Sequence, residues 1–194
     1  MATSATEVSN FFWHCLVVAK LTDEVKQTPA IKSHVARAVR MATLCTAGRN
    51  GVLYASASAR EEKDLQGKRW DQCGFIKEHV VPVSQIIARV RNQLEVTRDG
   101  LQAGLLAELS GEDVQGLTPD VINLFQQHPR ALQVARIVHK WTLLAWITEQ
   151  ENKLFDDKYR HGGISIRKRM PKGWTEGQDI FARYNACGIS VFPI

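Results

Sequence analysis

The residues best suited to chemistry lie in one short motif, Glu78-His79-Val80-Val81-Pro82, which Ser84 follows. A histidine changes its protonation near neutral pH, so it can act as a general base, and a neighbouring carboxylate can bind a divalent metal. The same two side chains can instead form a hydrogen-bonded structural pair where a strand turns into a helix. The motif leaves both interpretations open.

This motif resembles the first motif of HNH nucleases, the ββα-metal or His-Me finger group, in which an acidic residue and a histidine end one strand and a proline follows. The resemblance implies that His79 activates water as a general base and that Glu78 binds a divalent metal. Asn92 lies close to the place of the family's asparagine, although the sequence around it reads as a helix. The resemblance therefore makes Asn92 a further candidate catalytic residue.

The rest of the HNH pattern is incomplete. The family's closing histidine is missing, because the next histidine after Asn92 is His128, and the C-x-x-C pairs that flank many of these motifs are absent. A divalent metal is expected only if the nuclease interpretation holds, and no other cofactor is expected. The sequence favours the structural pair.

A second resemblance covers more of the chain. The segments KEHVVPVSQI, ITEQENKLF, RKRMPKGW and ARYNACGI, with an apolar stretch between the first two, resemble a group of small uncharacterised proteins of phages, plasmids and bacterial genomes. The resemblance implies a mobile-element setting, in which nucleic-acid handling and interference with host defence are common roles. It does not choose between them.

Residues 160–174 form the best candidate for nucleic-acid binding, because they contain several cations and no Asp or Glu. Flexible basic side chains can match phosphate spacing, and a nearby aromatic ring can stack on a base. The candidate binding residues are Arg167, Lys168, Arg169, Lys172 and Trp174. In the alternative interpretation, Met170-Pro171 and Trp174 pin the loop to the core and leave the cations solvated.

A second basic stretch, residues 30–50, also has no Asp or Glu. Its apolar residues recur at helical spacing, while Lys32, Arg37 and Arg40 lie on the other side. Such a face either contacts nucleic acid or a partner, or is simply solvated.

Composition and length predict a folded protein with a sizeable core. The chain has 194 residues, 44% hydrophobic residues and a net charge of +5, which favours acidic partners. No signal peptide and no membrane-spanning stretch are recognised, so we expect a cytoplasmic protein with no membrane partner. The four cysteines are widely spaced and are expected to be reduced, mainly buried thiols.

Caps and stops predict a single domain over residues 1–194, mostly α (α or α+β) and rich in helices, with a few short strands around residues 50–80. Helices are expected near Ser4-x-x-Glu7, after Thr28-Pro29, after Pro82 with Ser84 as cap, after Thr118-Pro119, over 130–147, and after a capping box at Thr148-x-x-Glu151. Residues 49–77 are expected to be largely irregular, with strands at 51–56 and 73–77. The tail, 164–194, is expected to fold back over the core.

The sequence thus predicts a non-enzymatic binder of nucleic acid or of a nucleoprotein complex, with a phage or plasmid anti-defence role as its most specific version. The alternatives are a metal-dependent HNH-like nuclease centred on His79 and a protein-interaction module whose basic residues are incidental. Phosphate-binding loops, dinucleotide fingerprints, serine-hydrolase elbows and HExxH pairs are absent from the sequence. The sequence does not specify the oligomeric state.

Overall fold

The structure, a computed structural model, describes residues 5–23, 28–50, 52–100, 123, 127–158, 161–175 and 177–194. The fold is rich in helices and contains one small sheet, as the sequence predicts. The chain divides into two compact units, each built from two separate stretches: Met1–Arg49 with Ile86–Lys140, and Asn50–Gln85 with Trp141–Ile194. We call them the helical unit and the sheet unit. The expectation of one domain over residues 1–194 stays a prediction.

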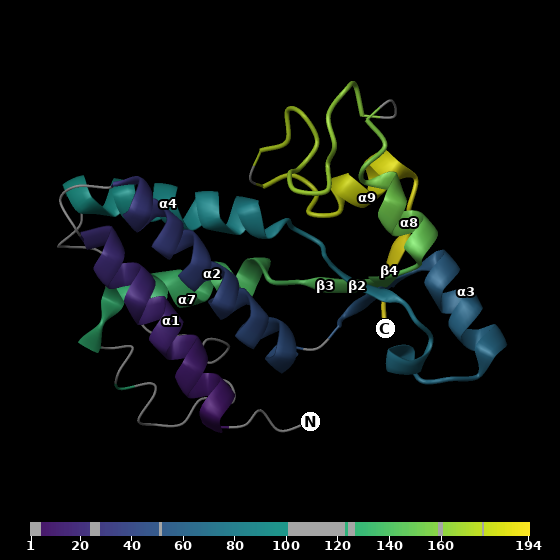
Figure 1. Cartoon of the computed structure of the whole chain (residues 1–194), viewed down its shortest axis with the longest axis horizontal. Helices are drawn as coiled ribbons and strands as arrows, with labels where there is room; N and C mark the ends of the chain where they lie inside the picture. The colour runs from purple at the N-terminus through teal and green to yellow at the C-terminus, as the bar shows by residue number, and fades with distance from the viewer. Residues whose placement is uncertain are drawn as a thin grey trace. The chain divides into compact units, whose positions relative to one another are not determined.

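Among the described residues, the helical unit contains α1 (Ala5–Asp23), α2 (Pro29–Asn50), most of α4 (Val83–Gly100) and α7 (Pro129–Trp141), which lie side by side in Figure 1. Thr28 caps α2, because its hydroxyl accepts a hydrogen bond from the Ile31 amide at 3.3 Å, and Pro29 occupies the first helical position. Val35, Ala38 and Ala42 of the expected stripe are buried. The short helix expected after Thr118-Pro119 lies outside the described residues.

The sheet unit contains four short strands in the order β2-β3-β1-β4. They are β1 (Tyr54–Ser56), β2 (Ile76–His79), β3 (Leu144–Ile147) and β4 (Val191–Pro193). β3 pairs parallel with β1 and antiparallel with β2, and β4 pairs antiparallel with β1. The strands expected at 51–56 and 73–77 are confirmed within a few residues, whereas β3 and β4 lie outside the region in which strands were expected.

The helix expected over residues 130–147 is wrong in its second half, because α7 ends at Trp141 and β3 follows. All four residues of β3 are buried, since β3 is an inner strand with neighbours on both sides. A short run that is apolar throughout fits a buried strand as well as a buried helix, so periodicity cannot separate them.

Residues 57–66 were expected to be irregular, but they form α3 (Ala57–Gln66). Ser56 caps this helix by accepting from the Ala59 amide, and Gly67 ends it in the left-handed conformation with φ of 63°. Ala59 is the buried residue of α3. A helix with so little buried surface has no apolar stripe to reveal it in the sequence. The short 3₁₀ helix η1 (Trp70–Gln72) follows.

The capping box at Thr148-x-x-Glu151 is confirmed at the start of α8 (Glu149–Leu154). Ser84 does not cap α4 as expected, since the helix already begins at Val83 and the Ser84 hydroxyl donates to the Lys168 carbonyl. The tail folds back as expected: it supplies α9 (Ala182–Cys187) and β4. It also contributes four residues to the core of the sheet unit: Ile166, Tyr184, Cys187 and Ile189.

All four cysteines are thiols, and Cys15 and Cys187 are buried while the other two are partly exposed. Burial raises the pKa of Cys15 well above its usual range. None of the helices that the structure describes combines the length and the apolar composition needed to cross a bilayer.

Candidate nucleic-acid interface

Glu78 and His79 lie at the end of β2, opposite Ala145 and Leu144 of β3. The Glu78 carboxylate accepts from Nη2 of Arg183 at 2.7 Å, and its side chain is 18% exposed. Arg183 comes from α9, far along the chain, and is completely buried. The first two residues of the motif thus lie beside a buried cation that is 105 residues away from Glu78 in the sequence.

Arg183 makes hydrogen bonds in two directions. Besides Glu78 it donates to the His79 carbonyl, and it donates through Nη1 to the carbonyls of Ile166 at 3.3 Å and Arg167 at 2.6 Å. Its guanidinium also lies 4.5 Å from the ring centroid of Phe155. One buried side chain therefore joins the end of β2 to the backbone at Ile166 and Arg167.

His79 is half-buried, and its Nδ1 atom is buried without a hydrogen-bond partner. Burial lowers the pKa of His79 below its usual 6.5, Glu78 acts in the opposite direction, and Arg183 lowers it further. The imidazole is therefore neutral at neutral pH. A neutral imidazole suits a general base, but it also suits a histidine that simply packs in a partly apolar setting.

The surroundings of Glu78 do not fit a divalent metal. The guanidinium of Arg183 occupies one carboxylate oxygen and would repel a second cation at the same place. Within the described ranges, no group of three or more His, Cys, Asp or Glu side chains is arranged to hold a metal ion. Asn92 is exposed on α4 and belongs to the helical unit, whereas His79 belongs to the sheet unit. The structure thus gives no support for a metal-binding HNH site.

The five candidate nucleic-acid-binding residues fall into two groups. Arg167 is partly buried and held within the fold: its Nε lies 2.6 Å from Oδ2 of Asp156, and its Nη2 donates to the Asn152 carbonyl at 3.0 Å. Trp174 donates through its indole N–H to the Asp179 carbonyl at 2.9 Å and packs edge-on against Trp141. Both side chains have roles in holding the loop.

Lys168, Arg169 and Lys172 form the second group, and all three are exposed. The backbone beneath them is fixed, because Ser84 donates to the Lys168 carbonyl and Met170 is buried with 5% exposure. We call residues 167–172 the basic loop. The two interpretations of this loop are compatible: its backbone is pinned to the core, while three cations remain at the surface, where they can meet phosphates.

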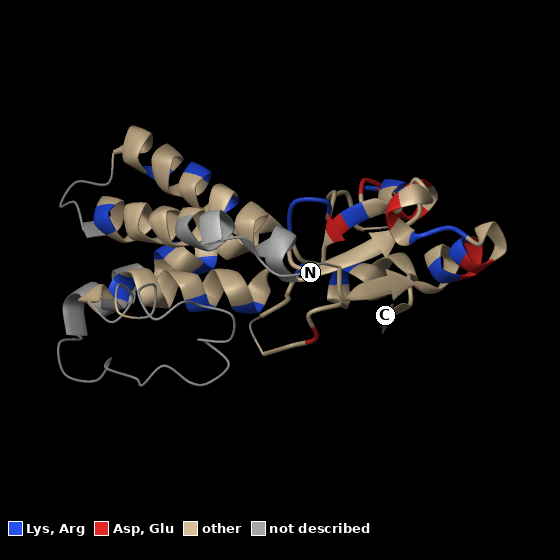
Figure 2. Cartoon of the chain, turned by 90° about the horizontal axis from the view of Figure 1, so that it is seen from below, with Lys and Arg blue, Asp and Glu red and all other residues tan. Residues whose placement is uncertain are grey.

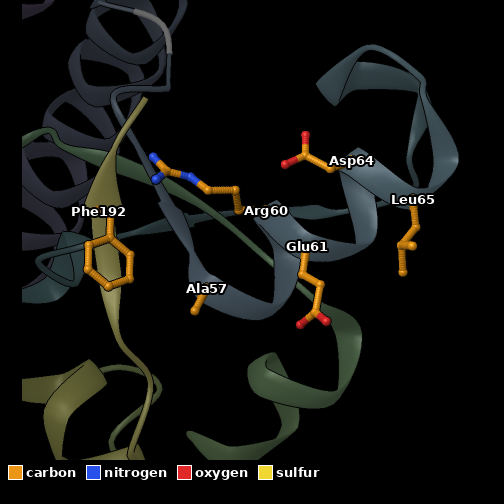
Figure 3. Close-up of a pocket in the computed structure, with 6 residues that line it drawn as sticks. All are labelled: Ala57, Arg60, Glu61, Asp64, Leu65 and Phe192. Carbon is orange, nitrogen blue, oxygen red and sulfur yellow. The ribbon is translucent and has the colours of Figure 1, made fainter.

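A shallow hollow of about 590 Å³ between α3 and β4 is a separate feature of the sheet unit (Figure 3). Its lining includes Arg60, Glu61, Asp64 and Phe192. Arg60 extends toward β4, where it donates to the Pro193 carbonyl at 2.5 Å and lies 5.7 Å from the centre of the Phe192 ring. The cation is thus occupied in joining α3 to β4.

Arg183 could not have been found from its residue type, because arginine is rarely fully buried and ARYNACGI reads as an ordinary helix. Neighbouring Tyr184 is also buried, and burial raises the pKa of its hydroxyl well above the usual range. In comparisons with known proteins, no protein-family model, no curated protein and no solved structure matches the chain.

Proposed function

We propose that this chain binds nucleic acid, alone or within a nucleoprotein complex, through phosphate contacts of the basic loop, and that it does not cleave it. The observation that carries the proposal is the exposure of Lys168, Arg169 and Lys172 above a backbone that hydrogen bonds from Ser84 and Arg183 hold in place. Attraction between such cations and phosphates supplies most of the affinity of sequence-independent binding.

The Glu78-His79 motif has a supporting role in this proposal. Arg183 contacts the end of β2 and the backbone carbonyls of Ile166 and Arg167 at the same time. A loop held in its binding conformation loses less conformational entropy when it binds, so more of the electrostatic attraction appears as affinity. The buried salt bridge thus fixes the backbone of the loop without touching the ligand.

The resemblance to small phage and plasmid proteins supports a finer version of the proposal. In that version the chain acts in the cytoplasm on nucleic acid or a nucleoprotein complex of a mobile element or of host defence. A basic loop with a fixed backbone suits a protein that binds nucleic acid through its phosphates.

The test is a loop variant carrying Lys168→Ala, Arg169→Ala and Lys172→Ala. Each lost phosphate contact lowers the log-log salt slope of duplex binding by about 0.9, so we expect a slope lower by about 2.7 and weaker binding. The measurement is fluorescence anisotropy with a short labelled duplex and a labelled single strand across a salt series. Arg167 is left in place because removing it would disturb Asp156 and Asn152.

The matched control carries Lys68→Ala, Arg69→Ala and Lys153→Ala, which removes the same charges from exposed positions elsewhere in the sheet unit. It should keep the salt slope of the parent. A loop variant that binds like the parent, or a control that loses as much, would contradict the proposal. Incubation of the parent with Mg²⁺ or Mn²⁺ should leave both substrates intact, and cleavage that disappears in His79→Ala would favour the nuclease instead.

A further inference from the structure

Helix α2 carries positive charge with no negative charge beside it along the helix. Its residues, Pro29–Asn50, include Lys32, Arg37, Arg40 and Arg49 and no Asp or Glu. Figure 2 shows Lys and Arg in blue along the helices of the helical unit.

Lys32, Arg37 and Arg40 of α2 are exposed, while Val35, Val39 and Ala42 are buried. At a rise of about 1.5 Å per residue, Lys32 and Arg40 are about 12 Å apart along the helix axis. Phosphates of one strand of a duplex follow one another about every 3.4 Å along the axis, so the three cations span about three phosphate steps.

The backbone that carries these cations is fixed to its neighbours. Nη2 of Arg91 on α4 donates to the Lys32 carbonyl at 2.5 Å, which joins α4 to the first turns of α2 and places a second positive group beside Lys32. The buried Val35 and Val39 hold the following turns in the core. Cations on a packed helix keep fixed positions relative to one another, which suits a partner that presents several phosphates.

The absence of Asp and Glu from the whole of α2 is the second argument. Solvated helix faces usually mix positive and negative residues, because like charges on neighbouring turns repel and opposite charges attract. On a face that carries only positive charges this repulsion is not offset, and the face creates a positive potential that attracts polyanions. Nucleic acid supplies the missing negative charge when it binds.

We propose that the face of α2 formed by Lys32, Arg37 and Arg40 is a second nucleic-acid-binding surface, which contacts the phosphates of a duplex. This α2 face belongs to the helical unit and the basic loop to the sheet unit, so the inference goes beyond the function proposed above and does not depend on it. The α2 face contacts backbone phosphates, which carry no direct sequence information, so it adds affinity and not sequence preference.

The test is an α2 variant carrying Lys32→Gln, Arg37→Gln and Arg40→Gln, since glutamine keeps an aliphatic stem and forms helices nearly as well. We expect the duplex salt slope to fall by about 2.7, for three lost contacts of about 0.9 each. Circular dichroism and thermal unfolding should show a helical content and a melting temperature like those of the parent. The charge-matched control is again the variant with Lys68→Ala, Arg69→Ala and Lys153→Ala.

Separate variants make the two proposals distinguishable. If the α2 variant keeps the salt slope of the parent while the loop variant loses it, the α2 face is not a binding surface and the basic loop is. If only the α2 variant has a lower salt slope than the parent, the α2 face is a binding surface and the basic loop is not. If both surfaces bind the duplex, a variant that carries all six substitutions should show a decrease in salt slope equal to the sum of the two separate decreases.

Exposed Met41 and Leu44 lie on the same helix, with 40% and 59% exposure, so the competing partner is an anionic membrane. Vesicles of phosphatidylglycerol mixed with phosphatidylcholine serve as the probe for it. Preference for these vesicles over duplex DNA, with only vesicle binding lost in the α2 variant, would overturn the inference. Duplex binding that exceeds vesicle binding and depends on the three cations supports it.

Discussion

Arg183 shows how one residue can connect two motifs that the sequence keeps apart. A guanidinium without solvent exposure must place its charge beside a carboxylate and its N–H groups against oxygens, and Arg183 does so with Glu78 and three carbonyls. The Nε atom is the exception, since it is buried without a partner. The salt bridge is therefore a structural element whose loss leaves a carboxylate in a poorly solvated place.

Replacing Arg183 with methionine should lower the free energy of unfolding by about 3 kcal/mol, because the Glu78 carboxylate loses its partner and three carbonyls lose a donor. Urea unfolding followed by circular dichroism measures the change. The additional replacement Glu78→Gln should restore part of the loss, since no uncompensated charge remains. Arg69→Met is the control, because the Arg69–Asp71 pair is exposed. Equal unfolding midpoints for Arg183→Met and Arg69→Met would contradict this role.

The lowered pKa of His79 predicts how the stability of the folded protein depends on pH. Its pKa is lowered in the folded protein, mainly by burial, so between that value and the unfolded value of 6.5 the unfolded chain binds more protons. Protons then favour unfolding, and stability should fall as the pH decreases below about 6.5 until the folded pKa is passed. Above this pH range His79 is neutral in both states, so its titration no longer changes the stability. The measurement is urea unfolding between pH 5 and pH 7.5.

His79→Gln should lose less stability than the parent over this pH range, because glutamine does not titrate. The comparison of the two proteins cancels the contribution of the other titrating groups, including His14, whose pKa burial also lowers. Parallel stability curves for parent and His79→Gln would show that His79 keeps an ordinary pKa.

At the scale of elements, Glu151 joins two parts of the sheet unit. Its Oε2 accepts from the Thr148 amide at 2.9 Å, which closes the capping box of α8, and from the Ser56 hydroxyl at 2.6 Å. Ser56 in turn caps α3. One carboxylate therefore connects the starts of two helices that follow neighbouring parallel strands.

Glu151→Ala should lower the free energy of unfolding by about 2 kcal/mol, since it removes a helix cap and leaves the buried Ser56 hydroxyl without its acceptor. Glu151→Gln should cost less, because the amide oxygen can still accept. Glu149→Ala on the same helix is the control, as Glu149 is exposed and forms an exposed ion pair with Lys153. Chemical denaturation of the three variants measures the differences, and equal losses for Glu151→Ala and Glu149→Ala would rule out the connection.

At the scale of the whole molecule, the chain passes twice through each unit, and each unit has its own core and its own cations. The two proposed surfaces therefore lie on different elements: one has three exposed cations on the basic loop, and the other has three on helix α2. A net charge of +5 alone does not reveal this, because it averages over residues of both signs.

The sequence by itself determined the features that depend on neighbours along the chain. The cap at Thr28-Pro29, the capping box at Thr148 and Glu151, and the rich helix content are local, because a helix end is satisfied by residues three or four positions away. The absence of Asp and Glu from residues 160–174 and 30–50 was also visible.

Only the tertiary structure decided the features that depend on distant partners. β3 is a strand because β1 and β2 pair with it, although its apolar run also fits the end of a helix. Which cations of the basic loop stay exposed depends on Asp156 and Asn152, which hold Arg167. The role of Glu78 depends on Arg183, which lies 105 residues further along the chain. A buried charge needs a partner, and sequence spacing does not show which residue the fold brings there.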